Sequence, residues 1–274
     1  MAEGSDLAVH RILVALDESE GGAAALEAAV LLGALLRAEL EAVFVEDLNL
    51  LRLARLPFAR ELLGASAAQR PLDPTTMERA LHSQGERLRR RLAVRLQAAD
   101  LHWSFAVLRG QVAGELLERA KGADLVILGR AGMSPGRAAA LGSTARTLLA
   151  AAGCAVLLAH PRAPPAQPVV VVFDASPGAR RALALGIRLA RRDDNALVVL
   201  LPAPVDEALA EQAREMAAAG GLDAQLRPLA SRDPRRLAAS VHDAGGRILV
   251  VGAGSIAERE RLGAALSCPV LLVP

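Results

Sequence analysis

Hydrophobic positions along the chain follow two alternating patterns. Short runs of Val, Ile and Leu are almost wholly apolar, and the longer Ala-, Arg- and Leu-rich runs between them repeat their apolar positions with the period of a helix. This alternation is typical of βαβ units, in which helices cover a buried parallel sheet, so we expect an α/β protein. The expected strands are Arg11–Leu16, Leu40–Glu46, Trp103–Arg109, Leu125–Leu128, Ala155–Ala159, Val169–Phe173, Ala196–Leu201, Ala224–Leu229, Ile248–Val251 and Pro269–Val273.

A proline-rich segment divides these strands into two sets of five. The sequence HPRAPPAQP, at residues 160–168, contains four prolines, which prevent a helix and stiffen the chain. We therefore predict two domains, at residues 1–160 and 169–274, joined by a linker at residues 161–168.

The two sets of strands look like repeats of one unit. A shift of 157 residues places Asp174 on Asp17, at the end of the first strand of each set. A shift of 114 residues places Cys268 on Cys154, just before the last strand of each set. Agreement at both ends indicates an internal repeat.

Composition and charge exclude several classes of function. The chain of 274 residues is 53% hydrophobic, but its longest apolar stretch, Ala23–Leu36, is interrupted by Glu27 and is shorter than the ~18 residues of a membrane-spanning helix. The first ten residues lack the pattern of a secretory signal, so we expect a cytoplasmic protein without a membrane partner. A net charge of +2 is too small for electrostatic capture of nucleic acid, and four Phe, one Trp and no Tyr leave few aromatic side chains on which bases could stack. We therefore expect no nucleic-acid partner.

One segment, Asp47–Leu72, occurs only in the first set. Its sequence LLRLARLPFARELL has apolar residues at helical spacing, which predicts a helix. Such a helix either packs on its own domain or covers a groove or a partner surface.

The residues after the strand at Leu125–Leu128 carry the pattern that predicts chemistry. Gly129 and Gly132 follow this strand, and nine residues later the run Gly142–Thr144 precedes a helix of small and apolar residues. Glycine lets the backbone approach a ligand, and the N–H groups of a loop and of a helix N-terminus attract anions. We therefore predict a phosphate-binding loop. The Ser and Thr of the run either cap the helix or offer hydroxyl groups to the phosphate.

Asp17 ends the first strand, at the sheet edge where open α/β folds bind ligands. Its carboxylate either accepts hydrogen bonds from ribose hydroxyls or an adenine amine, or it begins the next helix. The spacing GxGxxG of dinucleotide-binding folds and the P-loop spacing GxxxxGK[ST] are both missing after this strand. A nucleotide bound at this edge would therefore occupy a site of another type.

The pattern Gly129-x-x-Gly132, nine residues and Gly142-Ser143, between a buried strand and a helix, resembles the nucleotide loop of the universal stress protein family, in its ATP-binding branch. The final strand after Cys154 is similar as well, and the resemblance covers nearly the whole chain as a tandem pair. It implies two open parallel five-stranded sheets, each with strand order 3-2-1-4-5 and helices on both faces. It also implies ATP, with Mg²⁺, at the carboxyl edge of the sheet.

The resemblance further implies which residues form the adenine nucleotide site. Around the adenosine it places Ala15, Leu16, Asp17, Val45 and Leu128. Around the phosphates and the ribose it places Gly129, Arg130, Gly132, Gly142, Ser143 and Thr144. Arg130 departs from the family, which often has a smaller residue there. Its guanidinium either clamps a phosphate or extends into solvent.

The second set of strands lacks this loop. The shift between the two sets falls from 123 residues at Gly252 to 114 at Cys268, so nine residues are missing. Ile256 and Ala257 then stand where the first set has Gly142 and Ser143. We therefore expect one nucleotide site per chain, in the N-terminal domain, and only a capping role for the second set's aspartate.

The last strand of each set is expected at a sheet edge, where it can pair with another strand. Because members of the family commonly dimerise through this strand, the resemblance implies an intramolecular pseudo-dimer of the two domains, with a homodimer as a further assembly. If the two strands pair antiparallel, Cys154 and Cys268 lie far apart and form no disulfide. With no CxxC pair in the sequence, a zinc site is not indicated either.

These observations leave three hypotheses about function. The first is a stress-response signalling or regulatory module that binds ATP in its N-terminal domain, with little or slow hydrolysis. The second is a weak ATPase, which would need a positioned base and an electrophilic clamp. The third is a stress protein that binds a protein partner without nucleotide.

Overall fold

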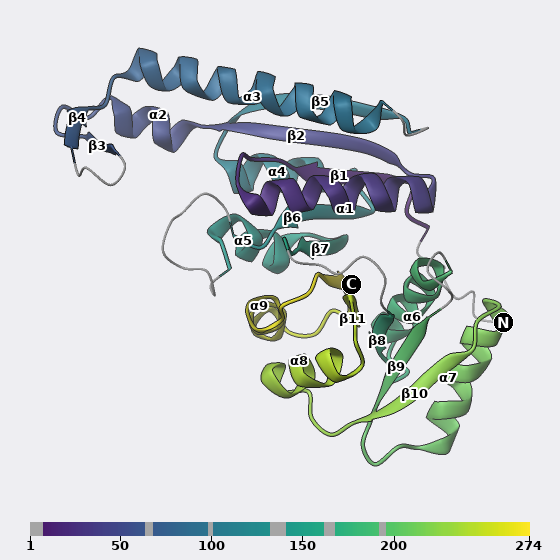
Figure 1. Ribbon diagram of the computed structural model, residues 1–274. Coiled ribbons are helices and arrows are strands. Elements are labelled where there is room, and N and C mark those ends of the chain that lie inside the picture. The colour runs from purple at the N-terminus through teal and green to yellow at the C-terminus, as the bar shows by residue number, and fades with distance from the viewer. Residues whose placement is uncertain (1–7, 64–67, 98–100, 132–140, 162–167, 192–195) are drawn as a thin grey trace.

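The computed structural model describes residues 8–63, 68–97, 101–131, 141–161, 168–191 and 196–274. Its strands are β1 (Arg11–Ala15), β2 (Glu39–Asp47), β5 (Trp103–Gly110), β6 (Leu125–Gly129), β7 (Ala155–Ala159), β8 (Val169–Val172), β9 (Leu197–Pro202), β10 (Ala224–Leu229), β11 (Ile248–Gly252) and β12 (Val270–Val273), with a hairpin of β3 (Arg60–Leu63) and β4 (Ala68–Pro71). All ten expected strands are confirmed, each within one residue at either end. The α/β class is therefore confirmed (Figure 1).

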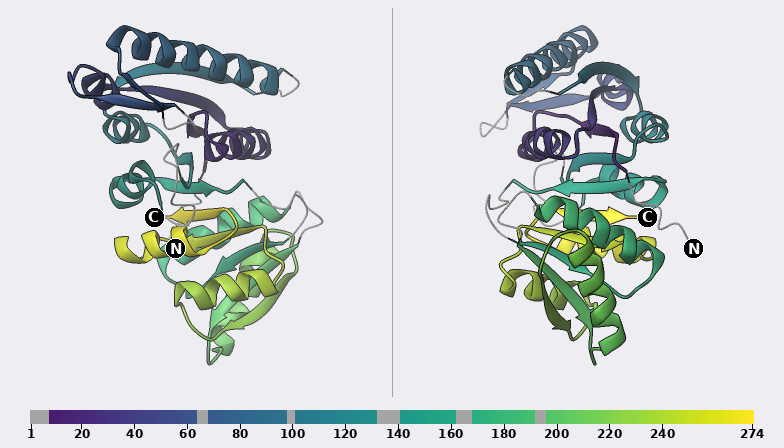
Figure 2. Two further views of the ribbon diagram at one scale, coloured as in Figure 1. Left: turned by 60° about the vertical axis from the view of Figure 1, so that its left-hand side comes forward. Right: turned by 90° about the vertical axis from the view of Figure 1, so that its right-hand side faces the viewer.

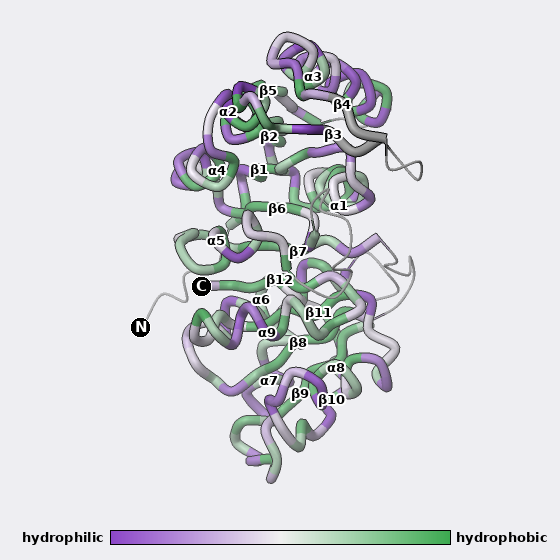
Figure 3. The backbone as a smooth tube through the Cα atoms, turned by 90° about the vertical axis from the view of Figure 1, so that its left-hand side faces the viewer, coloured by the Kyte–Doolittle hydropathy of each residue, from purple (hydrophilic) through white to green (hydrophobic). Residues whose placement is uncertain are grey.

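The ten strands form one continuous sheet in the order β10-β9-β8-β11-β12-β7-β6-β1-β2-β5. Each half has the expected strand order 3-2-1-4-5, and the two five-stranded sheets are joined edge to edge because their last strands pair, as expected for the two halves of one chain. Within each half all neighbouring strands pair parallel. Figure 3 shows the strands as one column from β5 to β10, and Figure 2 shows the N-terminal half stacked on the C-terminal half.

The two halves meet at β7 and β12, the last strand of each. These strands pair antiparallel, with Leu271 opposite Leu157. In this register Cys154 and Cys268 lie at opposite ends of the ladder, about six residues or roughly 20 Å apart at 3.3 Å per residue. That separation is well beyond the reach of a disulfide, and both cysteines are free.

Helices cover both faces of the sheet. They are α1 (Glu20–Leu36), α2 (Leu48–Ala54), α3 (Pro74–Leu96), α4 (Val112–Ala120), α5 (Ser143–Ala151), α6 (Pro177–Ala190), α7 (Glu207–Ala219), α8 (Pro234–Asp243) and α9 (Ile256–Ala265). One face carries a core built with α1, α3, α6 and α7, and the other face a core built with α4, α5, α8 and α9. Each core includes residues of both halves, so the hydrophobic layers continue across the junction. Among the described residues, no helix is long and apolar enough to cross a membrane.

The inserted segment is only partly helical. The helix α2 ends at Ala54, and Arg60–Leu63 forms the hairpin strand β3 instead of continuing the predicted helix. Pro57 explains this end, because a proline disfavours helical geometry at the residue before it. Since α2 packs against α3, the interpretation of a helix packed on its own half is confirmed.

Candidate functional site

Three neighbouring strands bring most of the predicted site residues to one edge of the sheet. The strands β6, β1 and β2 lie side by side and run parallel, so Leu128, Ala15 and Val45 all lie near their carboxyl ends. The side chains of Val45 and Leu128 are 8% and 3% exposed and belong to the core beneath α4 and α5. Leu16 is also buried, and its N–H donates to the carbonyl of Val43 at 2.9 Å.

Asp17 lies two residues after the end of β1, is half-buried, and forms the turn that begins α1. Its Oδ1 accepts hydrogen bonds from the Ser19 N–H, at 3.0 Å, and from the Ser19 hydroxyl. The Ser19 hydroxyl oxygen in turn accepts from the N–H of Gly22 at 3.0 Å and so caps the helix. Asp17 thus belongs to the turn that begins α1, as the second alternative predicted, whereas the N-cap itself is Ser19. Contact between its carboxylate and a ligand remains a prediction.

Gly129, the last residue of β6, lies against the backbone of α1. A Cβ at Gly129 would lie 2.6 Å from the carbonyl carbon of Gly21 and 2.8 Å from its Cα. The equivalent residues of the other half repeat this approach, since a Cβ at Gly252 would lie 2.8 Å from the carbonyl carbon of Gly178. Because the C-terminal half has no phosphate loop, this glycine pair has a packing role that is independent of any ligand.

The two described ends of the loop are joined by a backbone hydrogen bond. The Gly142 N–H donates to the carbonyl of Arg130 at 3.0 Å. Leu141, next to it, is buried with 5% of its side chain exposed. Gly132 lies outside the described residues, so its predicted role stays a prediction.

The helix α5 begins directly at the end of this loop. Gly142 is its N-cap, and no side chain of the described residues caps it. The prediction that Ser143 or Thr144 caps the helix is wrong, because both already lie within its first turn. Within the described part of the chain, the N–H groups of that turn therefore lack the side-chain acceptor that most helix N-termini have.

The matching helix of the other half is capped. Ser255 is the N-cap of α9, and its hydroxyl oxygen accepts from the Glu258 N–H at 3.3 Å. The two halves thus share the strand order but differ at the helix that would meet a phosphate.

Arg130 takes a position that the sequence did not predict. Its guanidinium donates to the carbonyl oxygens of Leu266 and, at 3.4 Å, of Gly263, at the C-terminal end of α9. The side chain is half-buried, and this burial lowers the pKa of the guanidinium. No sequence signal reveals this contact, because 136 residues separate Arg130 from Leu266.

In the C-terminal half, Asp174 forms the same turn as Asp17. Its Oδ1 accepts from the Ser176 N–H at 3.0 Å, so the expected structural role holds, but the N-cap of α6 is Ser176 and not Asp174. Its Oδ2 accepts from Arg232 at 2.6 Å. Burial alone would raise the pKa of Asp174, but the hydrogen bonds from Ser176 and the guanidinium of Arg232 outweigh it and lower that pKa.

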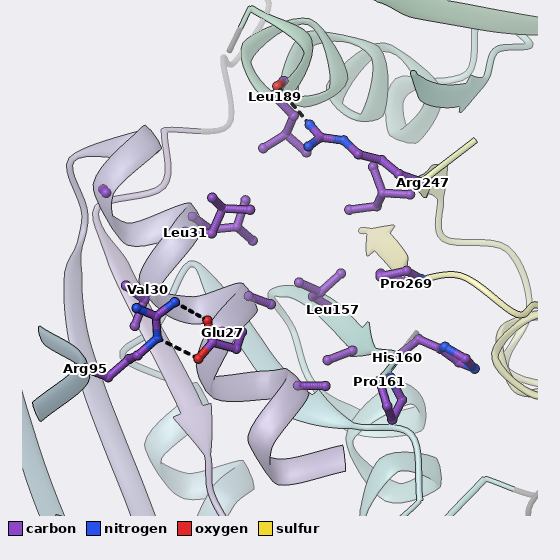
Figure 4. A pocket seen from close by; sticks show the side chains of 16 residues that line it. Glu27, Val30, Leu31, Arg95, Leu157, His160, Pro161, Leu189, Arg247 and Pro269 are labelled. Atoms are coloured by element: carbon purple, nitrogen blue, oxygen red, sulfur yellow. Dashed lines mark hydrogen bonds and ion pairs between the residues drawn. The ribbon is translucent and has the colours of Figure 1, made fainter. Parts of the chain in front are cut away.

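A separate cavity of about 580 Å³ lies between α1 and α6, over β7 (Figure 4). Its walls are mainly aliphatic, with Leu31, Leu157 and Leu189 among them. The polar side chains at its rim include Glu27 and Arg95, which form an ion pair with each other. None of the predicted nucleotide residues is among its lining residues, and aliphatic walls do not suit a triphosphate.

The described part of the chain contains no group of three or more His, Cys, Asp and Glu side chains that could hold a metal ion. Asp17 is the sole carboxylate among the predicted site residues, and the Ser19 turn already engages its Oδ1.

Comparisons with known proteins identify the family and the fold of this chain. Residues 8–160 match the model of the universal stress protein family. A universal stress protein from Archaeoglobus fulgidus DSM 4304 has a similar structure, with a TM-score of 0.74, 17% identity and 97% coverage of each chain. A putative universal stress protein from Pseudomonas aeruginosa UCBPP-PA14 gives a TM-score of 0.58 at 18% identity, over 98% of this chain and 94% of that one. No curated protein matches. At these identities the structural likenesses show the fold alone.

Proposed function

Because this chain belongs to the universal stress protein family, we propose that it binds ATP with Mg²⁺ at the carboxyl edge of its N-terminal half. In this proposal residues 1–160 form the nucleotide-binding domain and residues 169–274 a shortened domain without a nucleotide site. ATP occupancy then serves a regulatory role in a stress response.

One observation carries the proposal, namely the difference between α5 and α9. The N-terminus of α5 has no side-chain cap among the described residues, whereas Ser255 caps α9. An uncapped first turn presents N–H donors and the positive end of the helix dipole, which suit an anion. The uncapped helix follows the glycine-containing loop, so a phosphate group is the anion that fits best.

The other predicted residues have complementary roles around the same edge. The backbone at Gly129 and Gly142 and the hydroxyl groups of Ser143 and Thr144 contact the phosphates. Asp17 contacts the ribose or the adenine amine through the oxygen that the Ser19 turn leaves available, Oδ2. The aliphatic ends of β1, β2 and β6 lie beside the base.

We propose little or slow hydrolysis. Rapid phosphoryl transfer needs a base that positions the nucleophile and a clamp on the transferred group. Asp17 is held in its turn by Ser19, and the Arg130 guanidinium is held by carbonyl groups of α9. Neither residue is arranged as a catalytic group.

Calorimetric titration with ATP and Mg²⁺ tests this proposal. The informative variant is Gly142→Asp, because an N-cap φ of −62° suits any residue and aspartate is a good N-cap. The variant is therefore expected to fold, while its carboxylate occupies the first-turn N–H groups and repels phosphate. The matched control is Ile256→Asp, which adds the same charge to the first residue of α9, next to its N-cap Ser255, where the residue is 49% exposed.

We expect one equivalent of ATP per chain for the natural protein and for Ile256→Asp, and no binding by Gly142→Asp. Lack of binding by the folded natural protein rejects the proposal. Two equivalents per chain would reject the assignment to one half.

Partner binding without nucleotide is the second candidate, and one observation favours it. Leu50, Leu53, Leu56 and Phe58 of α2 and the turn after it are 41%, 45%, 40% and 74% exposed. Large apolar side chains that cluster at a surface often mark an interaction site. If ATP does not bind, this apolar segment is the next place to search for a partner.

A further inference from the structure

Helix α9 of the C-terminal half contacts both ends of the loop of the N-terminal half. At the first end, the Arg130 guanidinium donates to the carbonyl oxygens of Leu266 and Gly263. Those carbonyls belong to the last turn of α9, which carries the negative end of the helix dipole. A guanidinium is therefore a favourable group at this position, and it ties the residue after Gly129 to the other half.

At the second end, Leu141 packs on α9 at Gly263. A Cβ at Gly263 would lie 3.2 Å from both methyl carbons of Leu141 and 2.6 Å from Cδ1 of Leu158 in β7. Only glycine permits this close approach without displacing these side chains. The buried Leu141 immediately precedes Gly142, the N-cap of α5.

A reciprocal arginine contact holds α9 against α5. The Arg259 guanidinium, on α9, donates to the carbonyl of Leu149 near the end of α5 at 2.9 Å and to the carbonyl of Gly254 at 3.0 Å. Each half thus sends one arginine to the C-terminal carbonyls of a helix in the other half. The two helices lie next to each other at the junction (Figure 3).

We propose that α9 is a positioning element of the nucleotide site, although it lies in the half that has no site of its own. It holds the Arg130 and Leu141 ends of the loop at the spacing that the hydrogen bond from Gly142 to Arg130 requires. A backbone held in its binding geometry loses less conformational freedom when a ligand binds, so α9 raises the affinity for adenine nucleotide. This inference rests on the proposed function for the ligand, but the positioning itself can be measured without one.

The experiment uses the full chain and substitutes residues of the C-terminal half. Arg130 itself is left unchanged, because it is one of the residues predicted around the phosphates, so its substitution would not separate positioning from direct contact. Gly263→Val introduces a side chain whose Cβ alone would lie 2.6 Å from Cδ1 of Leu158 and 3.2 Å from the methyl carbons of Leu141. Arg259→Met removes the reciprocal contact. The matched control is Arg191→Met. Arg191 donates to the carbonyl of Gly220 at 2.7 Å within the C-terminal half, away from the junction.

Two quantities are measured for each variant, together with thermal unfolding to verify the fold. The first is the hydrogen-exchange rate of the Gly142 amide without nucleotide, and the second is the dissociation constant for ATP with Mg²⁺. For Gly263→Val and Arg259→Met we expect the exchange rate and the dissociation constant each to rise about tenfold, the equivalent of one weakened hydrogen bond or packing contact. For Arg191→Met both stay within about twofold of the natural protein.

Unchanged Gly142 exchange in folded Gly263→Val and Arg259→Met overturns the proposal whether or not ATP binds. Faster exchange with an unchanged dissociation constant overturns the role of α9 in affinity. Faster exchange in a protein whose natural form binds no ATP rejects the proposed function, while the positioning of the loop by α9 stands. If Gly263→Val does not fold, Gly263→Ala and Arg259→Met decide the same question.

Discussion

Gly129 and Gly21 approach each other so closely that a Cβ at Gly129 would lie 2.6 Å from the carbonyl carbon of Gly21. Through this contact the start of α1 packs directly against the end of β6. The C-terminal half repeats it between Gly252 and Gly178, where no phosphate loop follows. A glycine that sequence patterns assign to a ligand is thus also required by helix packing.

The first prediction concerns this packing role. Gly129→Ala should lower the free energy of unfolding by about 1–3 kcal/mol, because the added methyl group overlaps backbone atoms that cannot move aside alone. Gly252→Ala should have a similar effect, whereas Gly153→Ala, with open space around its Cβ position, should be close to neutral. Urea unfolding without nucleotide measures all three. A neutral effect of Gly129→Ala would contradict the packing role.

The second prediction separates capping from ligand contact at Asp17. Asp17→Ala and Asp174→Ala each remove the acceptor of an equivalent turn, so each should lower the free energy of unfolding by about 1 kcal/mol. Only Asp17→Ala should also weaken ATP binding. Calorimetry and urea unfolding on both variants give the comparison. Equal ATP affinity in the two variants would leave Asp17 with the capping role alone.

The third prediction concerns the junction between the halves. Leu271 is fully buried opposite Leu157, in a core shared by both halves. Leu271→Ala should therefore lower the free energy of unfolding by about 2–5 kcal/mol, through lost contacts and the cavity that remains. Leu31→Ala, at a side chain 37% exposed, should cost much less. The natural protein should unfold in one thermal transition, and separate transitions of the two halves would contradict a shared core.

The fourth prediction is a loss of stability at alkaline pH caused by Cys268. Burial raises the pKa of this thiol to about 11, so the folded chain keeps a proton that the unfolded chain releases above about pH 9. Because the native state then binds more protons, the free energy of unfolding decreases as pH rises between these values, by at most roughly 1 kcal/mol per pH unit. At neutral pH the effect is absent.

Cys268→Ala removes this contribution, so stability should fall less steeply in the variant between about pH 9 and about pH 11. Apart from the thiol of Cys154, whose pKa burial also raises, few other groups titrate in that interval, since the chain has no tyrosine and Lys121 is its sole lysine. Parallel pH dependences of the natural protein and the variant, measured by urea unfolding, would disprove the contribution of this thiol.

Much of the fold could be predicted because it depends on local patterns. Strands buried on both faces consist of continuous apolar runs, such as Val169–Val172, and these runs are visible without any knowledge of their neighbours. The turn at Asp17 and Ser19 is equally local, as its hydrogen bonds join residues two apart. The inserted segment was harder, because apolar spacing before Pro57 suits both the short helix and the hairpin that follows it.

The sequence by itself determined the ten strands, the position of the glycine-containing loop and its loss from the second half, since each depends on residues near one another along the chain. Only the tertiary structure decided that the hydrophobic cores continue across the junction and that Arg130 contacts the carbonyl of Leu266. Such contacts join residues more than a hundred positions apart. They depend on the antiparallel pairing of β7 and β12, which brings α9 beside α5, and no local pattern of residues encodes that geometry.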